Sequence, residues 1–561
     1  MVQTVAGLRD ARASAGMVPW WRDAVIYQIY PRSFADSDGN GVGDLRGVIE
    51  RLDYLNDGAG GSLGVDAVWL SPFYPSPGAD HGYDVSGYTG VDPLLGTLED
   101  FDHLLGAAHA RGIRVLIDLV INHTSVEHPW FRASRSSRAD PKRDWYVWAP
   151  PGPGGSPPNN WLSAFERVGS AWTLDEATGE CYLHTFTPGQ ADLNWRNPEV
   201  RAAIGDVMRF WLERGVDGFR VDVAHRLVKD EALRDNPPVL AHERRHVSHP
   251  WARQRNADHP DVHEVLRELR RTTDEYDAVL LGEVPIHDPA RLARYYGDGD
   301  ELHMAFNFAL WDVPWRARAW RHVVDALLAH LPARAWPCTA LSNHDIPRTV
   351  TRFGSDGRGR QRARVAAMLL LTLPGTPCLY AGEEIGMAGG GVSEQRRRDI
   401  DDRDESRTPM QWDPSGRGFS SGRSWLPVAP DAAVANVAVQ RHDPASVLSL
   451  YRRLIRRRRG SPALRRGTYE PLHGPAEVFA YRRAARGEQF VVALNFSSRH
   501  QRLRHHALPR GTVVEVCTDP ARDGEVLERH LVELGPDEGV VLRLPPAGAG
   551  RERGGRARAH R

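Results

Sequence analysis

The segment 218–225, Gly-Phe-Arg-Val-Asp-Val-Ala-His, holds the first residues whose types and spacing could do chemistry. It follows the apolar Val216 and runs into a polar loop, which predicts a buried β-strand. Side chains alternate along a strand, so Arg220 and Asp222 point to the same face. A guanidinium this close is expected to keep the carboxylate of Asp222 ionised, as a carboxylate nucleophile must be. These two residues alone also fit a structural ion pair in a core.

Further acids and imidazoles lie toward the ends of other apolar runs of the chain. One run contains Asp118 and His123, another contains Glu283, and a third ends in His344 and Asp345. If Asp222 and Glu283 end neighbouring strands, which lie about 4.8 Å apart, their carboxyls can face one another across the gap of about 5–5.5 Å that suits a retaining glycosidase. One carboxylate would then attack a sugar while the other handles the proton.

The elements that must position these residues recur from residue 20 onward. Eight short apolar runs each end in polar or charged residues and precede a helix-like segment: 24–31, 66–74, 113–123, 216–224, 278–284, 303–310, 338–345 and 376–386. Eight such units predict an α/β fold, a (β/α)8 TIM barrel whose active site lies at the carboxyl ends of the strands.

The barrel is expected to carry two further domains. Residues 20–123 and 190–465 would form the barrel, and the Trp-, Pro- and Gly-rich stretch 124–189 is too long for a loop, which predicts an inserted small domain after strand 3. Residues 228–260 form a second excursion, 387–425 a lid or wall, and 446–458 a basic amphipathic helix that closes the barrel. Short alternating strands predict a C-terminal all-β sandwich over 466–548. Residues 1–19 would be an extension, and the basic tail 549–561 is expected to be disordered.

Composition limits the classes of partner. The formal net charge of zero gives no general attraction to nucleic acid or to an anionic membrane. The four cysteines are scattered without a CxxC pair, which argues against a disulfide framework and favours a reducing compartment. The N-terminus lacks a signal-like apolar region, and no stretch approaches eighteen apolar residues. We therefore expect a cytoplasmic protein, monomer or homodimer, with no membrane or nucleic-acid partner.

Four segments, in this order and spacing, resemble the four signature regions of the α-amylase family, glycoside hydrolase family 13. They are 118–123 (DLVINH), 218–222 (GFRVD), 282–284 (GEV) and 342–345 (SNHD). The segment 190–194 (QADLN) is similar to a further signature of the α-glucosidase and oligo-1,6-glucosidase branch. The resemblance covers about residues 20–545.

The resemblance implies a role for each of these residues. Asp222 would attack the anomeric carbon and form a β-glucosyl ester, and Glu283 would protonate the leaving oxygen and then deprotonate water. Asp345 would hold sugar hydroxyls more tightly in the transition state than in the ground state. The supporting residues would be His123 and His344, which bond hydroxyls, Arg220, which keeps Asp222 charged, and Asp118, which buttresses the site.

The stretch 80–84 (DHGYD) resembles the substrate floor of this family. The resemblance implies that Tyr83 stacks on the terminal glucose and that Asp80 accepts from its 4-hydroxyl, assisted by Arg407 of the segment 406–412 (SRTPMQW). A charged pair behind the last sugar would stop a longer chain, which predicts exo-action on short saccharides. On the bare sequence, a surface salt bridge is the alternative for Asp80 and Arg407.

A possible metal loop follows the first predicted strand. Asp36, Asp38, Asn40 and Asp44 offer side-chain oxygens at alternate positions, Val42 offers its carbonyl, and a glycine allows the tight turn, as in calcium loops. The twelfth position is Gly47, so the loop is not an EF-hand. The family's glucosidase branch has a similar loop, and the resemblance implies a structural Ca²⁺ or Mg²⁺. A plain Asx/Gly turn is the alternative, and no organic cofactor is expected.

Two other motifs are interpreted as coincidences. Residues 242–246 (HERRH) match the zincin pattern HExxH, with His249 and His259 as third-ligand candidates, but they lie inside the excursion after strand 4. The glycines at 39, 41 and 43 hint at a phosphate loop but lack the final GK[ST]. Neither a zinc protease nor a phosphate site is predicted.

The residues and the resemblance together predict an enzyme: a retaining, exo-acting α-glucosidase that releases glucose from the non-reducing end of short α-glucosides. Val223 resembles the α-1,6-preferring members, whereas Ala224-His225 and 227–230 resemble α-1,4-glucosidases of actinobacteria, and we favour α-1,4. A transglucosylase or a sucrose/maltose isomerase would use the same glucosyl ester and stays open. A non-catalytic carbohydrate-binding homologue is the remote third alternative.

Overall fold

The computed structural model describes residues 18–239 and 255–546. Its centre is a parallel eight-stranded sheet in the order β11-β10-β9-β3-β2-β1-β13-β12, and a bridge between Phe306 and Cys338 joins the two ends. The strands are β1 (Ile26–Ile29), β2 (Ala67–Leu70), β3 (Arg114–Leu119), β9 (Gly218–Val221), β10 (Val279–Gly282), β11 (Met304–Ala305), β12 (Cys338–Ala340) and β13 (Thr376–Tyr380). Each lies inside one of the eight predicted runs, so the predicted barrel is confirmed.

These strands are short apolar runs because both of their faces are covered. Every residue of β1, β2, β9 and β10 is buried. Arg220 of β9 is in register with Asp118 of β3 on one side and with Leu281 of β10 on the other. This register brings Asp118, Asp222 and Glu283 to the same rim of the barrel.

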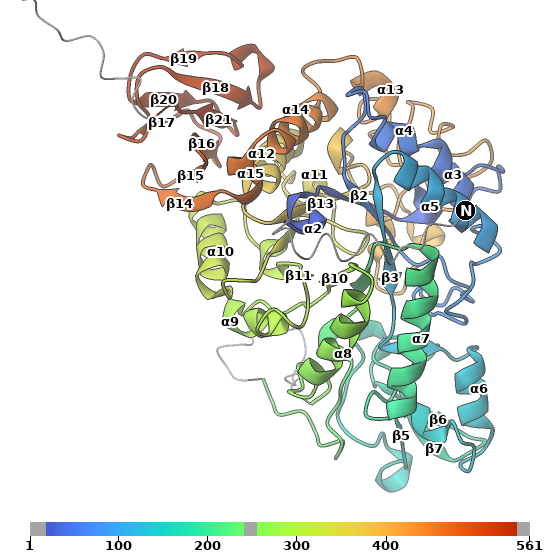
Figure 1. Cartoon of the computed structure of the whole chain (residues 1–561). Helices are drawn as coiled ribbons and strands as arrows, with labels where there is room; N and C mark the ends of the chain where they lie inside the picture. The colour runs from blue at the N-terminus through green and yellow to red at the C-terminus, as the bar shows by residue number, and fades with distance from the viewer. Residues whose placement is uncertain (1–17, 240–254, 547–561) are drawn as a thin grey trace, which may run out of the picture.

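Helices surround the sheet (Figure 1). Helix α7 begins after the Asn197 cap, with a proline at its first position, and ends at Gly215, whose φ of 106° is left-handed. The predicted basic helix is α14, capped by Ser446. The helices of the barrel are α2 (Trp20–Asp23), α3 (Leu45–Glu50), α4 (Leu52–Leu55), α5 (Leu98–Ala110), α7 (Pro198–Arg214), α8 (Val262–Asp274), α9 (Pro289–Ala293), α10 (Ala317–His330), α11 (Thr349–Arg352), α12 (Gly359–Thr372), α13 (Val437–Gln440), α14 (Val447–Arg459) and α15 (Pro462–Arg466).

A small unit is inserted between β3 and α7. Strands β4 (His123–Ser125) and β8 (Gln190–Asp192) pair at its two ends. Between them lie α6 (Pro129–Ser136) and a three-stranded sheet of β5 (Trp148–Ala149), β7 (Glu180–Leu183) and β6 (Trp172–Asp175). A separate apolar cluster that includes Trp161 and Cys181 fills it. In Figure 1 this unit and the C-terminal sheet lie at opposite ends of the molecule.

The C-terminal part is all β, as predicted. A six-stranded antiparallel sheet has the order β14-β15-β16-β21-β18-β19, and β17 pairs with β20. Phe496 packs on Trp315 at 4.4 Å between ring centroids, which joins this part to the barrel. The strands are β14 (Thr468–Leu472), β15 (Val478–Ala485), β16 (Glu488–Asn495), β17 (Gln501–Arg504), β18 (Thr512–Cys517), β19 (Val526–Leu527), β20 (Leu531–Leu534) and β21 (Gly539–Arg543).

Some predictions fall on residues outside those described. The HExxH motif at 242–246, the tail 549–561 and most of the extension 1–19 are among them. Within residues 18–239 and 255–546, no helix is both long enough and apolar enough to span a membrane.

Candidate functional site

Arg220 lies at the centre of three carboxyl groups. Its Nη1 donates to Oδ1 of Asp118 at 2.7 Å and to Oδ1 of Asp222 at 2.8 Å, and its Nη2 donates to Oε2 of Glu283 at 2.5 Å. Trp69 packs under the guanidinium, 4.9 Å from its ring centroid. Strands β3, β9 and β10 thus supply one acid each to a buried cluster, here called the Arg220 cluster.

One guanidinium cannot compensate three buried carboxylates. Burial raises the pKa of Asp118 to about 6, although Arg220 opposes it. Burial also raises the pKa of Asp222 well above its usual value, and the charges of Glu283 and Asp118 add to this effect and outweigh Arg220. Arg220 favours the charged form of Asp222, as predicted, but it does not set the net shift of the pKa, which is upward. Asp118 and Asp222 titrate as members of a coupled group.

Asp345, after β12, has the opposite surroundings. Its Oδ1 accepts from Nη2 of Arg407 at 2.8 Å and from Nη1 of Arg403 at 3.1 Å, and its Oδ2 lies 3.1 Å from Nε2 of His344. Burial alone would raise the pKa of Asp345, but at neutral pH the positive charges of Arg403 and Arg407 hold it below its usual range. Asp345 is ionised at neutral pH.

His344 is buried between two tyrosines. Its ring stacks on Tyr83 at 5.2 Å and on Tyr30 at 5.5 Å between centroids. Nδ1 accepts from Nε2 of Gln28 at 2.8 Å, which leaves the proton on Nε2, facing Asp345. Burial lowers the pKa of His344 to about 3, so the ring is neutral, and its Nε2 makes no hydrogen bond within the described part of the protein.

The charge partner of Asp80 differs from the prediction. Oδ1 of Asp80 accepts from Nη2 of Arg403 at 2.5 Å, whereas Arg407 bonds Asp345 and Asp399. Arg407 is fully buried, and its Nε donates to the carbonyl of His344. Arg403 begins a 3₁₀ turn, Arg403–Ser406, and bonds Asp80, whereas Arg407 follows the turn and is fully buried.

Sequence reasoning could have found Arg403. It lies four residues before Arg407, about one helical turn, in a segment rich in arginine and aspartate. The guanidinium of Arg403 also bonds Asp399 at 2.6 Å and lies 4.6 Å from the ring centroid of Phe165 in the inserted unit.

Tyr83 and His123 line the other side of the site. The hydroxyl of Tyr83 donates to Oδ2 of Asp118 at 3.0 Å, and Nε2 of His123 donates to the carbonyl of Tyr83 at 3.0 Å. Gln190 of β8 donates to Oδ2 of Asp80 at 3.1 Å. Burial lowers the pKa of His123, so its ring is neutral. The structure thus places the predicted catalytic and substrate-binding residues together in one region.

Lys229 is a buried residue whose part in the site was not predicted. Its Nζ lies 2.8 Å from Oδ1 of Asn122 and 2.8 Å from Oδ2 of Asp192. Asn122 follows β3, Asp192 ends β8, and Lys229 lies in the connection after β9. One ammonium therefore ties the barrel to the inserted unit.

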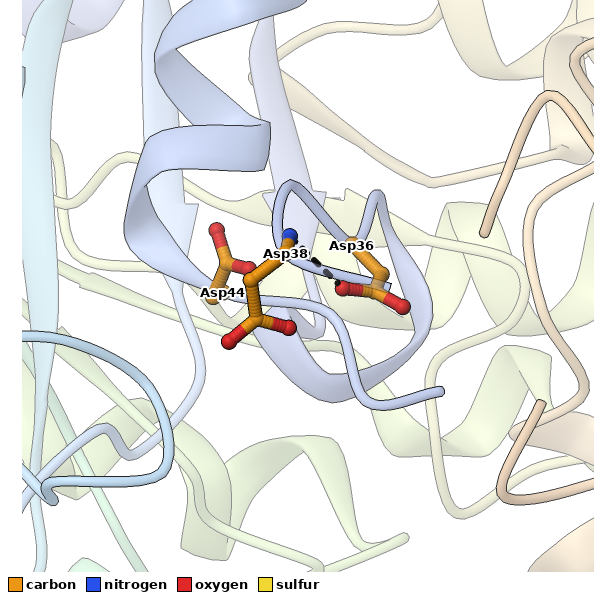
Figure 2. A group of neighbouring side chains, drawn as sticks. All are labelled: Asp36, Asp38 and Asp44. Carbon is orange, nitrogen blue, oxygen red and sulfur yellow. Dashed lines mark hydrogen bonds between the residues drawn. The ribbon is translucent and has the colours of Figure 1, made fainter. Parts of the chain in front are cut away.

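The predicted metal loop lies between β1 and α3. Figure 2 shows Asp38 between Asp36 and Asp44, and each of the three offers a carboxylate oxygen within 4.8 Å of the others. Backbone N–H groups already orient the loop: Asp36 accepts from Gly39 and Gly41, and Asn40 accepts from Val42. Hard oxygen donors of this kind fit Ca²⁺ or Mg²⁺. These same bonds are typical of Asx turns, so the metal itself stays a prediction.

Comparison with known proteins gives a consistent result. Residues 28–467 match the family model "Alpha amylase, catalytic domain". An oligo-1,6-glucosidase of Parageobacillus thermoglucosidasius is 39% identical, over 94% of this chain and 99% of that protein. A probable alpha-glucosidase of Rhizobium meliloti (strain 1021) is 44% identical, over 85% and 89%.

Solved structures of other proteins are similar to this one over nearly the whole chain. An alpha-glucosyl transfer enzyme has a TM-score of 0.88 and 41% identity, covering 94% of this chain and all of that one. The trehalulose synthase of Pseudomonas mesoacidophila MX-45 has a TM-score of 0.85 and 35% identity over the same shares. The chain therefore belongs to the α-amylase family of glycoside hydrolases, glycoside hydrolase family 13, in its α-glucosidase and oligo-1,6-glucosidase branch.

Proposed function

We propose that this protein is a retaining, exo-acting α-glucosidase that releases glucose from the non-reducing end of short α-glucosides. The observation that carries the proposal is the Arg220 cluster, in which one guanidinium bonds Asp222 and Glu283 from neighbouring strands. Two acids held side by side can divide the work between a nucleophile and a proton carrier.

The reaction would take two steps. Asp222 attacks the anomeric carbon while Glu283 gives its proton to the departing oxygen, and a glucosyl ester forms. Glu283 then takes a proton from water, the water oxygen attacks the anomeric carbon, and the ester bond breaks. The productive form of the Arg220 cluster would have its proton on Glu283 and none on Asp222.

Asp345 would stabilise the transition state. It is ionised, and Arg403 and Arg407 orient it. Its negative charge would stabilise the positive charge that develops on an oxocarbenium-like sugar. His344, neutral with its proton on Nε2, would add a donor beside it. Tyr83 would stack on the glucose, and His123 would bond a hydroxyl.

The exo-action would come from Asp80 and Arg403. Their ion pair, backed by Asp399 and Arg407, is buried and covered by Phe165. A wall of this kind would stop a longer chain from passing through. We retain the preference for α-1,4 over α-1,6 linkages as a proposal from Ala224-His225 and 227–230.

A transglucosylase or a sucrose/maltose isomerase is the second candidate, because solved relatives are named for glucosyl transfer and trehalulose synthesis. Both would use the same ester and differ in the acceptor. We also propose a reducing, cytoplasmic location, which the four free and buried cysteines support. The metal of the Asp36–Asp38–Asp44 loop would be Ca²⁺ or Mg²⁺.

The test is a product analysis of the purified chain with maltose, isomaltose, sucrose and trehalose. We expect glucose, first released as the α-anomer in NMR spectra, with maltose cleaved faster than isomaltose. Asp222→Asn should lose activity by several orders of magnitude, about 10⁴-fold or more. Unchanged glucose release by this variant would refute the proposal, and isomerised disaccharide in place of glucose would favour the second candidate.

A further inference from the structure

Val223, next to Asp222, has an unusual backbone conformation. Its φ of 35° and ψ of 46° are left-handed. Among the described non-glycine residues with positive φ, it is the one with a β-branched side chain, for which this region is least favourable. Such strain persists only where the surrounding structure imposes it.

The surrounding hydrogen bonds show what the strained turn does. The N–H of Val223 donates to Oε2 of Glu283 at 3.0 Å, and the next N–H, of Ala224, donates to the main-chain carbonyl of Glu283 at 3.0 Å. Just before the turn, the N–H of Asp222 donates to the carbonyl of Leu119 at 3.1 Å. The turn after β9 thus holds both the side chain and the main chain of Glu283.

The two oxygens of Glu283 are therefore not equivalent. Oε2 receives two donors, Nη2 of Arg220 and the N–H of Val223, which occupy both of its lone pairs. A proton cannot share that oxygen without displacing a donor, so it must lie on Oε1. We propose that Val223 is a positioning residue. Its strained backbone conformation directs its N–H to Oε2 of Glu283, which fixes Oε2 as an acceptor and leaves Oε1 as the oxygen that transfers the proton. This inference rests on the proposed function.

The proposal assigns each atom in the two steps. The proton leaves Oε1 for the glycosidic oxygen as its bond to the anomeric carbon breaks and the bond to Asp222 forms. The negative charge that appears on Glu283 is then stabilised at Oε2 by Arg220 and Val223. In the second step Oε1 accepts the proton of the attacking water as the ester bond breaks. The N–H of Val223 should matter most for leaving groups that need a proton.

An amide-to-ester replacement removes this donor alone. The chain is made with 2-hydroxy-3-methylbutanoic acid at position 223, which keeps the isopropyl side chain and lacks the N–H. Its kcat/KM is measured on maltose, whose leaving group needs a proton, and on α-glucosyl fluoride, whose fluoride leaves without one. We expect a loss of about tenfold or more on maltose and less than about threefold on the fluoride.

A matched control uses the neighbouring N–H. Lactic acid at position 224 removes the bond to the main-chain carbonyl of Glu283 and leaves its carboxyl group untouched. This chain should show a lowered Tm, and the ratio of its kcat/KM values for maltose and α-glucosyl fluoride should be unchanged. An equal loss on both substrates for the 223 ester, or no loss, overturns the inference. If the unaltered chain cleaves neither substrate, the proposed function fails separately.

A second measurement does not require the chain with the ester at position 223 to fold. In the native chain labelled with ¹⁵N-valine, the Val223 amide signal is identified by its loss in Val223→Ala. In Glu283→Ala, which lacks the carboxyl acceptor, this signal should shift more than those of the other valines. An unmoved signal overturns the hydrogen bond on which the inference rests.

Discussion

At the residue scale, the number of opposite charges that contact a buried carboxyl group decides whether its pKa rises or falls. In the Arg220 cluster, three carboxyls share one guanidinium, and the pKa values of Asp118 and Asp222 rise. A few residues away, Arg403 and Arg407 serve Asp345 and Asp399, whose pKa values fall despite burial. The pKa of the same side-chain type is thus raised in one half of the site and lowered in the other.

This contrast predicts opposite dependences of stability on pH. Because the pKa of Asp118 is raised from 3.8 to about 6 in the folded state, the folded state binds its proton more tightly. That contribution to the free energy of unfolding is fully present below the unfolded pKa and is lost as pH rises through about 6, by on the order of 3 kcal/mol. The Tm advantage of the wild type over Asp118→Asn should therefore shrink between pH 4 and pH 7.

The control is Asp345→Asn. The pKa of Asp345 is lowered in the folded state, so its contribution is present above the unfolded pKa and is lost as pH falls. The Tm advantage of the wild type over this variant should shrink in the acidic direction. Parallel trends for the two variants would contradict this account of the charges.

The two arginines behind the pocket should separate binding from stability. Arg403 contacts Asp80 at the pocket end with a side chain that is 10% exposed, whereas Arg407 is fully buried. Arg403→Ala should raise KM for maltose about tenfold or more with a small change in Tm. Arg407→Ala should lower stability by about 3–5 kcal/mol, because it removes one partner of buried ion pairs. Michaelis constants and thermal unfolding of the two variants check these expectations. A larger rise in KM for Arg407→Ala than for Arg403→Ala would assign the sugar-binding role to Arg407.

At the element scale, three segments meet at Lys229: the ends of β3 and β8 and the connection after β9. Of the two lysines in the chain, Lys142 lies over the Trp145 ring near the surface, and Lys229 is buried. Lys229→Met would leave the carboxylate of Asp192 without its cation, at a cost of about 3–5 kcal/mol. Lys229→Arg should not restore stability, because a planar guanidinium is wider than the ammonium that lies between Asn122 and Asp192.

Hydrogen exchange gives the measurement for Lys229. The amides of β8 should exchange faster in Lys229→Met, with a lowered Tm, because the inserted unit loses its tie to the barrel. Lys142→Met is the control and should leave both quantities nearly unchanged. Unaltered protection of β8 in Lys229→Met would show that the tie has no structural effect.

At the scale of the whole molecule, the sequence predicts the barrel well. Parallel strands covered on both faces are continuous apolar runs with polar ends, so all eight could be located from local pattern. The raised pKa of Asp222 could not, because its sign depends on acids from three strands. The pairing of Asp80 with Arg403 depends on the path of a loop without periodicity, and the tie at Lys229 joins segments far apart in the chain. Strands could be predicted because they depend on local sequence, whereas these contacts could not, because they join elements far apart in the chain.

The predicted metal loop joins distant parts of the chain in the same way. The N–H of Asp36 donates to the carbonyl of Phe419 at 2.8 Å, and the N–H of Trp425 donates to the carbonyl of Gly41 at 2.8 Å. The loop after β1 is thereby attached to the wall segment 387–425, which also carries Arg403. A cation held by Asp36, Asp38, Asn40, Asp44 and the carbonyl of Val42 would stabilise this connection only in the folded state.

Such a cation should raise the Tm of the whole chain. At a free concentration of 100 times its Kd, Ca²⁺ would add about 2.7 kcal/mol to the free energy of unfolding, and EDTA would remove it. Asp38→Ala should lose most of this response, because Asp38 is one of the three grouped carboxylates and its removal leaves too few oxygens. Asp57→Ala, at an exposed acid in the turn after α4, should keep the response. Equal Tm values of the wild type in EDTA, Ca²⁺ and Mg²⁺ would mean that the backbone N–H groups alone hold the loop, since those bonds already satisfy Asp36 without a metal.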